Sequence, residues 1–235
     1  MPRSSLFKVE GVSVDVEIRR HSRAKRLILR IDQATHRAVV TAPTFVPAKE
    51  VLGFAKSKRT WIEKSLREVP PPTPFTDGLD FPLEGQLTRI HRTDEGRGVI
   101  FDEQNALLRV ACAPEHLNRR VVDWLKRRAR DELEKATDAY SDAIGERRGP
   151  VRVRDQKTRW GSCSSDRVLS FSWRLILAPR FVLEYVAAHE CAHLKHMDHS
   201  KAFWALVDAL DTDRIRAEDW LRQEGRSLFV WGNPH

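Results

Sequence analysis

The feature that most constrains this chain is the short run His189-Glu190-Cys191-Ala192-His193. Residues four positions apart lie one turn apart on the same face of an α-helix, with about 5–6 Å between their Cβ atoms. Two imidazoles placed in this way can reach one Zn²⁺ ion at about 2.0–2.1 Å. Glu190 directly follows the first histidine and is better placed to take a proton from water than to bind the metal. The run therefore predicts a helix that carries two metal ligands and one general base.

A catalytic zinc ion needs a third protein ligand and an open position for water. His199 follows His189 by ten residues, which is the spacing of the H-E-x-x-H-x-x-G-x-x-H metal sites. Those sites have glycine at the bend, where this chain has His196. We expect Met197-Asp198 to form the turn instead, because aspartate tolerates left-handed backbone. Glu218 and His196 are the alternative third ligands.

The hydrophobic pattern predicts a mixed α+β chain. Segments 12–18, 27–31 and 38–40 alternate and are predicted to form an antiparallel meander, and a helix is expected over about 47–69. A proline-rich linker, 70–76, and short strands near 79–92, 98–101 and 106–112 follow, and no internal repeat is visible. We therefore expect a β-rich region over 1–112 and a catalytic domain over 113–235. In that domain the predicted elements are a helix over 114–144, a strand over 168–177 and a helix from Pro179 to Lys195, followed by two shorter helices.

Composition excludes several protein classes. The chain has 235 residues and a net charge of +8, with no apolar run near the ~20 residues of a membrane span. Its three cysteines argue against a disulfide framework, so we expect a cytoplasmic protein that is not in a membrane. Residues 1–180 carry 35 basic and 24 acidic side chains, whereas residues 181–235 carry 6 and 9. This basic N-terminal part suggests nucleic acid as one candidate partner.

Four segments resemble the YgjP-like family of zinc metallopeptidases, relatives of the SprT and WLM proteases. They are Arg159-Trp160-Gly161-Ser162-Cys163-Ser164, Trp173 to Pro179, Tyr185 to Leu194, and His199-Ser200 with Phe203-Trp204. The resemblance implies a compact zincin-like domain with the histidine run on a central helix, behind a β-rich N-terminal region. It also implies zinc at His189, His193 and His199, with Glu190 as the base.

We therefore expect a zinc-dependent metallohydrolase that holds one Zn²⁺ per chain and cleaves peptide or protein substrates. Arg159, Tyr140 and His196 are the candidates for stabilising the oxyanion or binding substrate. The edge of the strand over 168–177 is expected to border the cleft and pair with an extended peptide. We interpret Cys163 as a small residue in a tight turn rather than a nucleophile. The alternatives are a metal-dependent nucleotide phosphohydrolase, a nucleic-acid-associated protease and a non-catalytic structural zinc protein.

Overall fold

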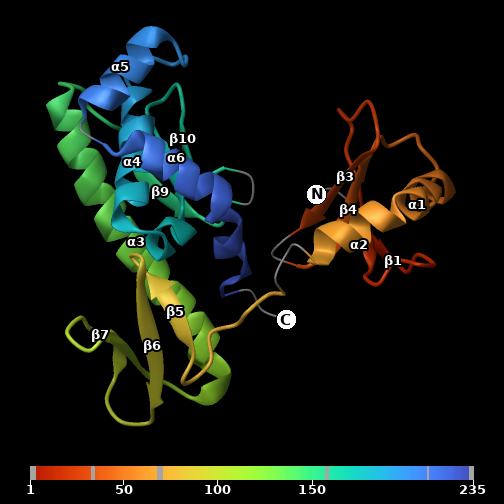
Figure 1. Ribbon diagram of the computed structural model, residues 1–235, viewed down its shortest axis with the longest axis horizontal. Coiled ribbons are helices and arrows are strands. Elements are labelled where there is room, and N and C mark those ends of the chain that lie inside the picture. Colours follow the sequence, from red (N-terminus) through yellow and green to blue (C-terminus); the bar gives the residue numbers. More distant parts are fainter. Residues whose placement is uncertain (1–3, 33–34, 68–70, 157–158, 211, 233–235) are drawn as a thin grey trace. The chain divides into compact units, whose positions relative to one another are not determined.

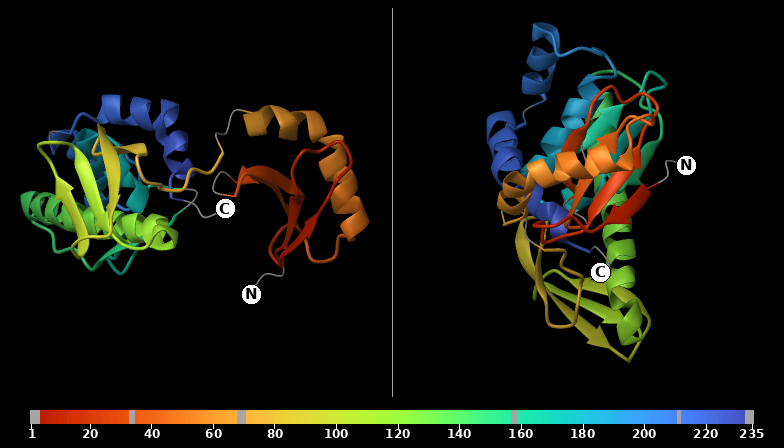
Figure 2. Two further views of the ribbon diagram at one scale, coloured as in Figure 1. Left: turned by 90° about the horizontal axis from the view of Figure 1, so that it is seen from below. Right: turned by 90° about the vertical axis from the view of Figure 1, so that its right-hand side faces the viewer.

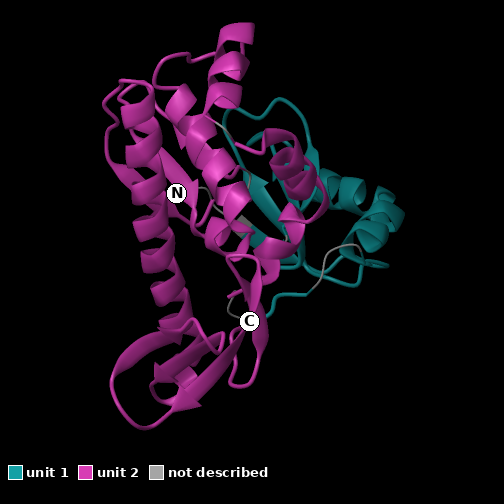
Figure 3. Cartoon of the chain, turned by 60° about the vertical axis from the view of Figure 1, so that its left-hand side comes forward, with its two compact units in different colours: residues 1–73, 233–235 teal, residues 74–232 magenta. Residues whose placement is uncertain are grey.

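The chain folds into two compact units in the computed structural model, which describes residues 4–32, 35–67, 71–156, 159–210 and 212–232. Unit 1 comprises residues 1–73 with 233–235, and unit 2 comprises residues 74–232 (Figure 3). Both units contain sheets and helices, and the helices dominate after residue 113 (Figure 1). The predicted mixed α+β class is confirmed. None of the helices in the described ranges combines the length and apolar character needed to cross a membrane.

Unit 1 is a four-stranded sheet covered by two helices. Its strands are β1 (Ser4–Phe7), β2 (Val16–Arg20), β3 (Ile28–Asp32) and β4 (Arg37–Ala42). Helices α1 (Ala48–Ser57) and α2 (Arg59–Arg67) lie against one face of the sheet (Figure 2). The apolar sheet residues pack on four buried helix residues, Val51, Ala55, Ile62 and Leu66. The helix expected over 47–69 is thus two helices that meet at Lys58.

The predicted antiparallel meander in unit 1 is wrong. The strand order is β1-β2-β4-β3, and β2 runs parallel to β4. The reason is that alternation of apolar residues shows which side chains are buried but does not show which strands are neighbours. Strand β4 occupies a central position and has buried residues on both of its faces.

Unit 2 begins with a second four-stranded sheet. Its strands are β5 (Asp80–Leu83), β6 (Gln86–Thr93), β7 (Gly98–Asp102) and β8 (Leu107–Ala111), in the order β5-β6-β8-β7. Phe81, Ile90 and Leu108 from this sheet belong to the same buried core as the later helices. We expected a boundary at residue 112, but the boundary between the two units lies at 73/74. The apolar face of this sheet joins it to the unit that holds the helices.

The two four-stranded sheets share one topology, which the sequence did not reveal. Both have an antiparallel, a parallel and an antiparallel pairing in the same order. In both, an aspartate that ends a strand, Asp32 or Asp102, accepts a 3.2 Å bond from the backbone N–H three residues later. The residue after that donor, His36 or Ala106, has a φ of 49° or 48°. Few side chains are shared beyond the aspartates, so the repeat is structural.

The rest of unit 2 is a long helix, a small sheet and a group of shorter helices. Helix α3 (Leu117–Ala143) follows a 3₁₀ turn (Pro114–His116) and packs along α4 and β9. The small sheet contains β9 (Val151–Arg154), β10 (Gly161–Cys163) and β11 (Leu169–Ser172). The later helices are α4 (Arg180–Ala192), α5 (Lys201–Ala209) and α6 (Arg214–Gln223), with 3₁₀ helices at Trp173–Leu177 and Gly225–Val230.

The strand expected over 168–177 is shorter and lies elsewhere in the sheet. It ends at Ser172, whose hydroxyl accepts a hydrogen bond from the N–H of Arg174 at the start of a 3₁₀ helix. The strand order is β10-β11-β9. Strand β11 is therefore central, and β10 lies at the edge of the sheet where we expected β11. Side-chain alternation could not reveal this, because β10 is only three residues long and lies in a loop-like sequence.

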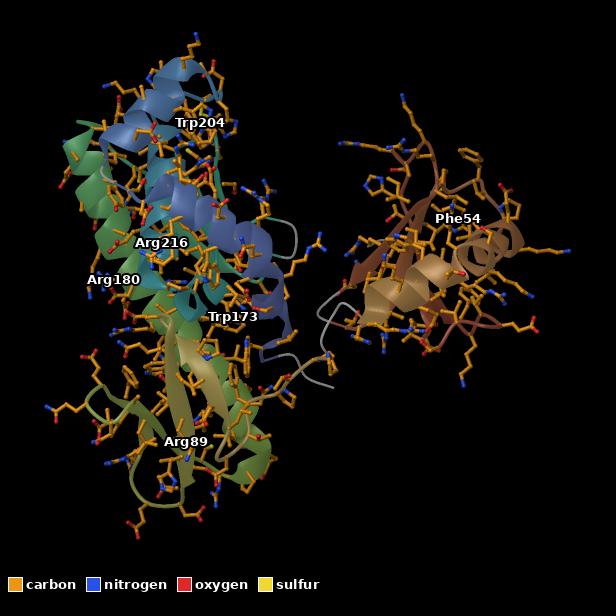
Figure 4. The ribbon with its side chains drawn as sticks, viewed as in Figure 1. Phe54, Arg89, Trp173, Arg180, Trp204 and Arg216 are labelled. Atoms are coloured by element: carbon orange, nitrogen blue, oxygen red, sulfur yellow. The ribbon has the colours of Figure 1, made fainter. Side chains whose placement is uncertain are left out.

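A buried arginine joins the 3₁₀ helix after β11 to the end of unit 2. Arg174 is 1% exposed, and its guanidinium lies 4.5 Å from the ring centre of Trp173, the side chain labelled in Figure 4. It pairs with Asp155 and donates a 3.3 Å bond to the backbone oxygen of Trp231. A planar cation that stacks and donates several bonds can connect segments in this way, whereas lysine cannot.

Replacing Arg174 should therefore destabilise unit 2. We expect Arg174→Ala to lower the free energy of unfolding by about 2–4 kcal/mol, because it removes a buried side chain and its stacking contacts. Arg174→Met keeps the apolar stem and should lose less. Arg222→Ala is the control, since that side chain is 73% exposed and should change stability by about 0.5 kcal/mol at most. Urea denaturation followed by circular dichroism measures all three, and equal losses for Arg174→Ala and Arg222→Ala would contradict the assignment.

Candidate metal centre

Helix α4 presents two histidines to the same space. It begins directly after Pro179, whose fixed φ suits a helix start. Most of its residues are buried, so its orientation is set by packing on all sides. His189 and His193 occupy adjacent turns, and their ring centres are 5.0 Å apart. The helix therefore holds two imidazoles in a rigid, half-buried position.

The chain then turns back and brings a third imidazole to the first two. His199 lies just before α5, whose N-terminus is capped by the hydroxyl of Ser200 on the N–H of Phe203. Its Nε2 atom is 3.2 Å from the Nε2 atom of His189. One ring nitrogen from each of His189, His193 and His199 lies within 4.8 Å of the others. Among the described residues, the left-handed positions do not include 194–199, so the turn needs neither glycine nor the left-handed aspartate that we expected.

The three histidines fit a tetrahedral metal ion. With Zn–N bonds of about 2.0–2.1 Å, two ligand atoms of a tetrahedral ion are about 3.3 Å apart. The 3.2 Å between the Nε2 atoms of His189 and His199 is close to this length. Nδ1 of His193 lies 3.0 Å from the carbonyl oxygen of His196. Nδ1 must be protonated there, because a carbonyl only accepts, and this leaves the Nε2 lone pair free for a metal.

The protonation states also suit a metal site. Burial, with His193 and His199 nearby, lowers the pKa of His189 to about 4. Burial also lowers the pKa of His193. Neutral imidazole is the form that binds a metal, so these two rings are ready to do so at neutral pH.

Phe203 forms the floor of the histidine cluster. It is fully buried on α5, and its ring centre lies 4.9, 4.5 and 4.8 Å from those of His189, His193 and His199. Trp204, labelled in Figure 4, stacks on His199 at 5.6 Å. The guanidinium of Arg214 lies 5.1 Å from the Trp204 ring. Helix α5 thus positions the exposed His199 through aromatic packing.

Glu190 lies on the side of α4 that faces the small sheet. Its side chain is buried, and strand β10 passes directly over it. A Cβ atom at Gly161 would lie 2.5 Å from Oε1 of Glu190, so only glycine leaves room for the carboxylate. The backbone N–H of Cys163 donates to that carboxylate. Gly161 therefore leaves room for the carboxylate of Glu190, and the backbone N–H of Cys163, two residues later on β10, orients it.

Burial is the main electrostatic influence on Glu190. It raises the pKa of the carboxyl to about 8, against the opposing effects of the Cys163 N–H and the charge of Arg159. A divalent cation held by the histidines would oppose the effect of burial and lower this pKa, since it favours the charged form. Burial raises the pKa of the Cys163 thiol to about 11. That thiol is therefore protonated at neutral pH, in line with its interpretation as a structural residue.

The other predicted site residues have different surroundings. Glu218, on α6, accepts a 2.9 Å bond from the hydroxyl of Tyr185 and lies 3.7 Å from Arg214. His196 contributes its backbone oxygen to His193. Within the described ranges, the cluster of metal-binding side chains contains neither Glu218 nor His196. Arg159 is exposed and acts on Glu190 through its charge, and Tyr140 is half-buried near the end of α3.

Sequence reasoning missed the supporting roles of Gly161 and Phe203. Gly161 and Phe203 stand in segments that carried the family resemblance, which was the available signal. Their roles depend on which segments meet in space, and spacing along the chain does not show that.

Phe203→Ala should loosen the three histidines together. We expect it to reduce the free energy of unfolding by about 3–5 kcal/mol, because it opens a cavity in the core. We also expect Zn²⁺ affinity to fall by about tenfold or more, because the rings lose their support. Competition with a chromogenic chelator measures the affinity on protein that circular dichroism shows to be folded. Phe45→Ala is the control, since Phe45 is 79% exposed; unchanged Zn²⁺ affinity in Phe203→Ala would remove Phe203 from the site.

A family model and a solved structure match parts of this chain. A model of the family described as "YgjP-like, metallopeptidase domain" matches residues 25–224. No curated protein matches the chain. Among solved structures, the zymogen of the metallopeptidase abylysin from Pyrococcus abyssi matches with 23% identity and a TM-score of 0.36, over 40% of this chain and 96% of that one. The family match covers most of the chain and confirms the resemblance seen in its sequence, so the chain belongs to the YgjP-like metallopeptidase family and is a hydrolase of peptide or protein substrates.

Proposed function

We propose that this chain hydrolyses peptide bonds with one Zn²⁺ ion held by His189, His193 and His199 and with Glu190 as general base. The observation that carries the proposal is the convergence of three imidazole nitrogens within 4.8 Å, beside a buried carboxylate on the same helix. Three protein ligands leave one position of a tetrahedral ion open, as catalytic zinc sites require. A purely structural zinc site would have that position closed by a fourth ligand.

The donor set favours zinc and peptide hydrolysis. Imidazole is a common ligand of Zn²⁺, whereas Mg²⁺ in phosphate-cleaving sites is bound by carboxylates. The cluster of metal-binding side chains in the described ranges consists of histidines alone. This argues for a peptidase over a nucleotide phosphohydrolase. When bound, the ion makes water more acidic and polarises the carbonyl to be cleaved.

Glu190 moves the proton in the proposed reaction. One of its carboxylate oxygens accepts a proton from the attacking water, and the same carboxyl later donates it to the nitrogen of the leaving amine. The Cys163 N–H orients the carboxylate. Gly161 leaves the space that the carboxylate occupies.

Two further features would position the substrate. Strand β10 is an edge strand directly beside Glu190, so an extended peptide could add to it by main-chain hydrogen bonds. Arg159 precedes β10 and is exposed, which makes it our first candidate for stabilising the oxyanion. Tyr140 and His196 stay as alternatives. The three cysteines are free in the structure, and we keep the cytoplasm as the proposed location.

Separate variants should remove the metal and the base. We expect His189→Ala to lose Zn²⁺, measured by elemental analysis, because one of three ligands is gone. Glu190→Gln should keep about one Zn²⁺ per chain while cleavage of a peptide library falls by about 10²–10⁴-fold. His91→Ala, which changes an exposed histidine on β6, is the control. Cleavage by Glu190→Gln at the unmodified rate would show that Glu190 is not the base.

Gly161→Ala should displace the carboxylate without touching the metal. A methyl group there would lie 2.5 Å from Oε1 of Glu190, and misplacing a catalytic group by about 1 Å costs about 10²-fold in rate. We expect that loss in kcat with normal zinc content. Gly53→Ala, in α1, is the matched control because nothing lies within 4 Å of its added Cβ. Equal activity of Gly161→Ala and Gly53→Ala would contradict the role assigned to Gly161.

A further inference from the structure

Unit 1 holds the whole excess of positive charge. Residues 1–73 contain 15 basic and 7 acidic side chains, whereas residues 74–235 contain 26 of each. The proposed chemistry of unit 2 uses none of this charge. A unit with its own core and a charge of this size therefore has its own candidate partner, which should be acidic.

A groove of about 380 Å³ opens on unit 1 between β3 and the two helices. Its floor is apolar, because Leu27, Leu29 and Phe54 (labelled in Figure 4) pack on the core of the unit. Its rim carries two large apolar side chains, Ile28 and Trp61, which are 47% and 46% exposed. Exposed apolar side chains that gather at one concave place mark binding sites more often than single ones do.

Two cations border the same groove. Arg26 and Lys58 are exposed, and neither forms an ion pair with any described residue. Many other arginines in the chain pair with a carboxylate, including Arg19 and Arg30, which pair with Asp32 at the far end of β3. The charges at the groove are therefore available for acidic groups of a partner.

The groove follows an open sheet edge. Strand β3 is the last strand in the order β1-β2-β4-β3 and pairs with β4 alone in the described part of the chain. Proteins usually protect such edges with charged side chains or with a covering segment. Arg30 does this in the second half of β3, where its guanidinium lies 3.5 Å from the buried Asp32, but Ile28 and Leu29 leave the first half apolar.

We propose that this groove binds an extended segment of the substrate protein in which pairs of apolar residues alternate with pairs of acidic residues, so that each face of the strand carries both kinds of side chain. The segment adds to the edge of β3 by main-chain hydrogen bonds, places apolar side chains against Trp61 and Phe54, and directs acidic side chains to Arg26 and Lys58. An apolar floor beside a strand edge suits a peptide better than a nucleic acid, which needs stacked aromatic rings along a basic track. The proposal rests on the peptidase function only for the origin of the segment, since binding needs neither metal nor Glu190.

The test measures binding to the full-length chain carrying Glu190→Gln. The probe is a fluorescein-labelled peptide with the repeating sequence valine-valine-glutamate-glutamate, and its binding is followed by fluorescence anisotropy. Valine–lysine and N-methylated versions are the control peptides. We expect the acidic peptide to bind about tenfold or more tightly than either control. The lysine peptide carries the opposite charge, and the N-methylated peptide cannot donate main-chain hydrogen bonds to the strand edge.

Matched variants locate the site. Trp61→Ala and Lys58→Glu should each weaken binding by about tenfold. Phe45→Ala, which also removes an aromatic ring, and Lys49→Glu, which repeats the charge reversal, lie at exposed positions of unit 1 outside the groove and should stay within about twofold of the parent. Lys58→Arg should retain binding, and thermal melts confirm that each variant is folded.

Three results would overturn the proposal. Equal losses in Lys49→Glu and Lys58→Glu would show diffuse charge attraction instead of a groove. Tighter binding of oligo-dT than of the peptide, lost in the same variants, would assign the groove to nucleic acid. Undiminished peptide binding in Trp61→Ala and Lys58→Glu would place the contact elsewhere. Peptide binding together with an absence of peptidase activity in the chain that retains Glu190 would refute the proposed function but not the proposed groove.

Discussion

The site depends on the approach of His199 to His189. Their Nε2 atoms are 3.2 Å apart, and two imidazole lone pairs can lie so close only with a proton or a cation between them. The low pKa of His189 keeps its ring neutral, and neutral imidazole is the form whose lone pair can bind a metal ion. The turn after α4, the cap of α5 by Ser200 and the aromatic floor of Phe203 all serve this approach. The small sheet supplies the remaining element by placing β10 over Glu190.

The two units contain the same strand arrangement, but the sheet has a different role in each unit. In unit 2 the four-stranded sheet packs on the core that includes α3 and α4, so it helps to hold the helix that carries His189 and His193. In unit 1 the same arrangement closes on its own helices and leaves one edge beside a basic, apolar groove. The same strand arrangement therefore supports the metal site in unit 2 and offers a candidate binding edge in unit 1. Side chains such as Trp61 and Lys58 give unit 1 its groove.

The histidine run and the family resemblance were readable from sequence because their meaning is local. The i, i+4 spacing of His189 and His193 determines their shared face wherever the helix lies. The parallel pairing of β2 with β4 and the central place of β11 were not readable, whereas the unit boundary at 73/74 falls within the proline-rich linker predicted over 70–76. The places of β2 and β11 depend on contacts between distant segments, which hydrophobic alternation does not encode. For the same reason Gly161 stood out as part of a motif, while its contact with Glu190 became visible only in the fold.

The most direct test of the central claim is a crystal of the full chain grown with Zn²⁺ and measured on both sides of the zinc absorption edge. The account predicts one strong anomalous peak per chain, within about 2.0–2.1 Å of a ring nitrogen from each of His189, His193 and His199. The carboxylate of Glu190 should lie near the peak without binding the ion. A peak coordinated by Glu218, or three imidazoles that diverge around no peak at all, would contradict it.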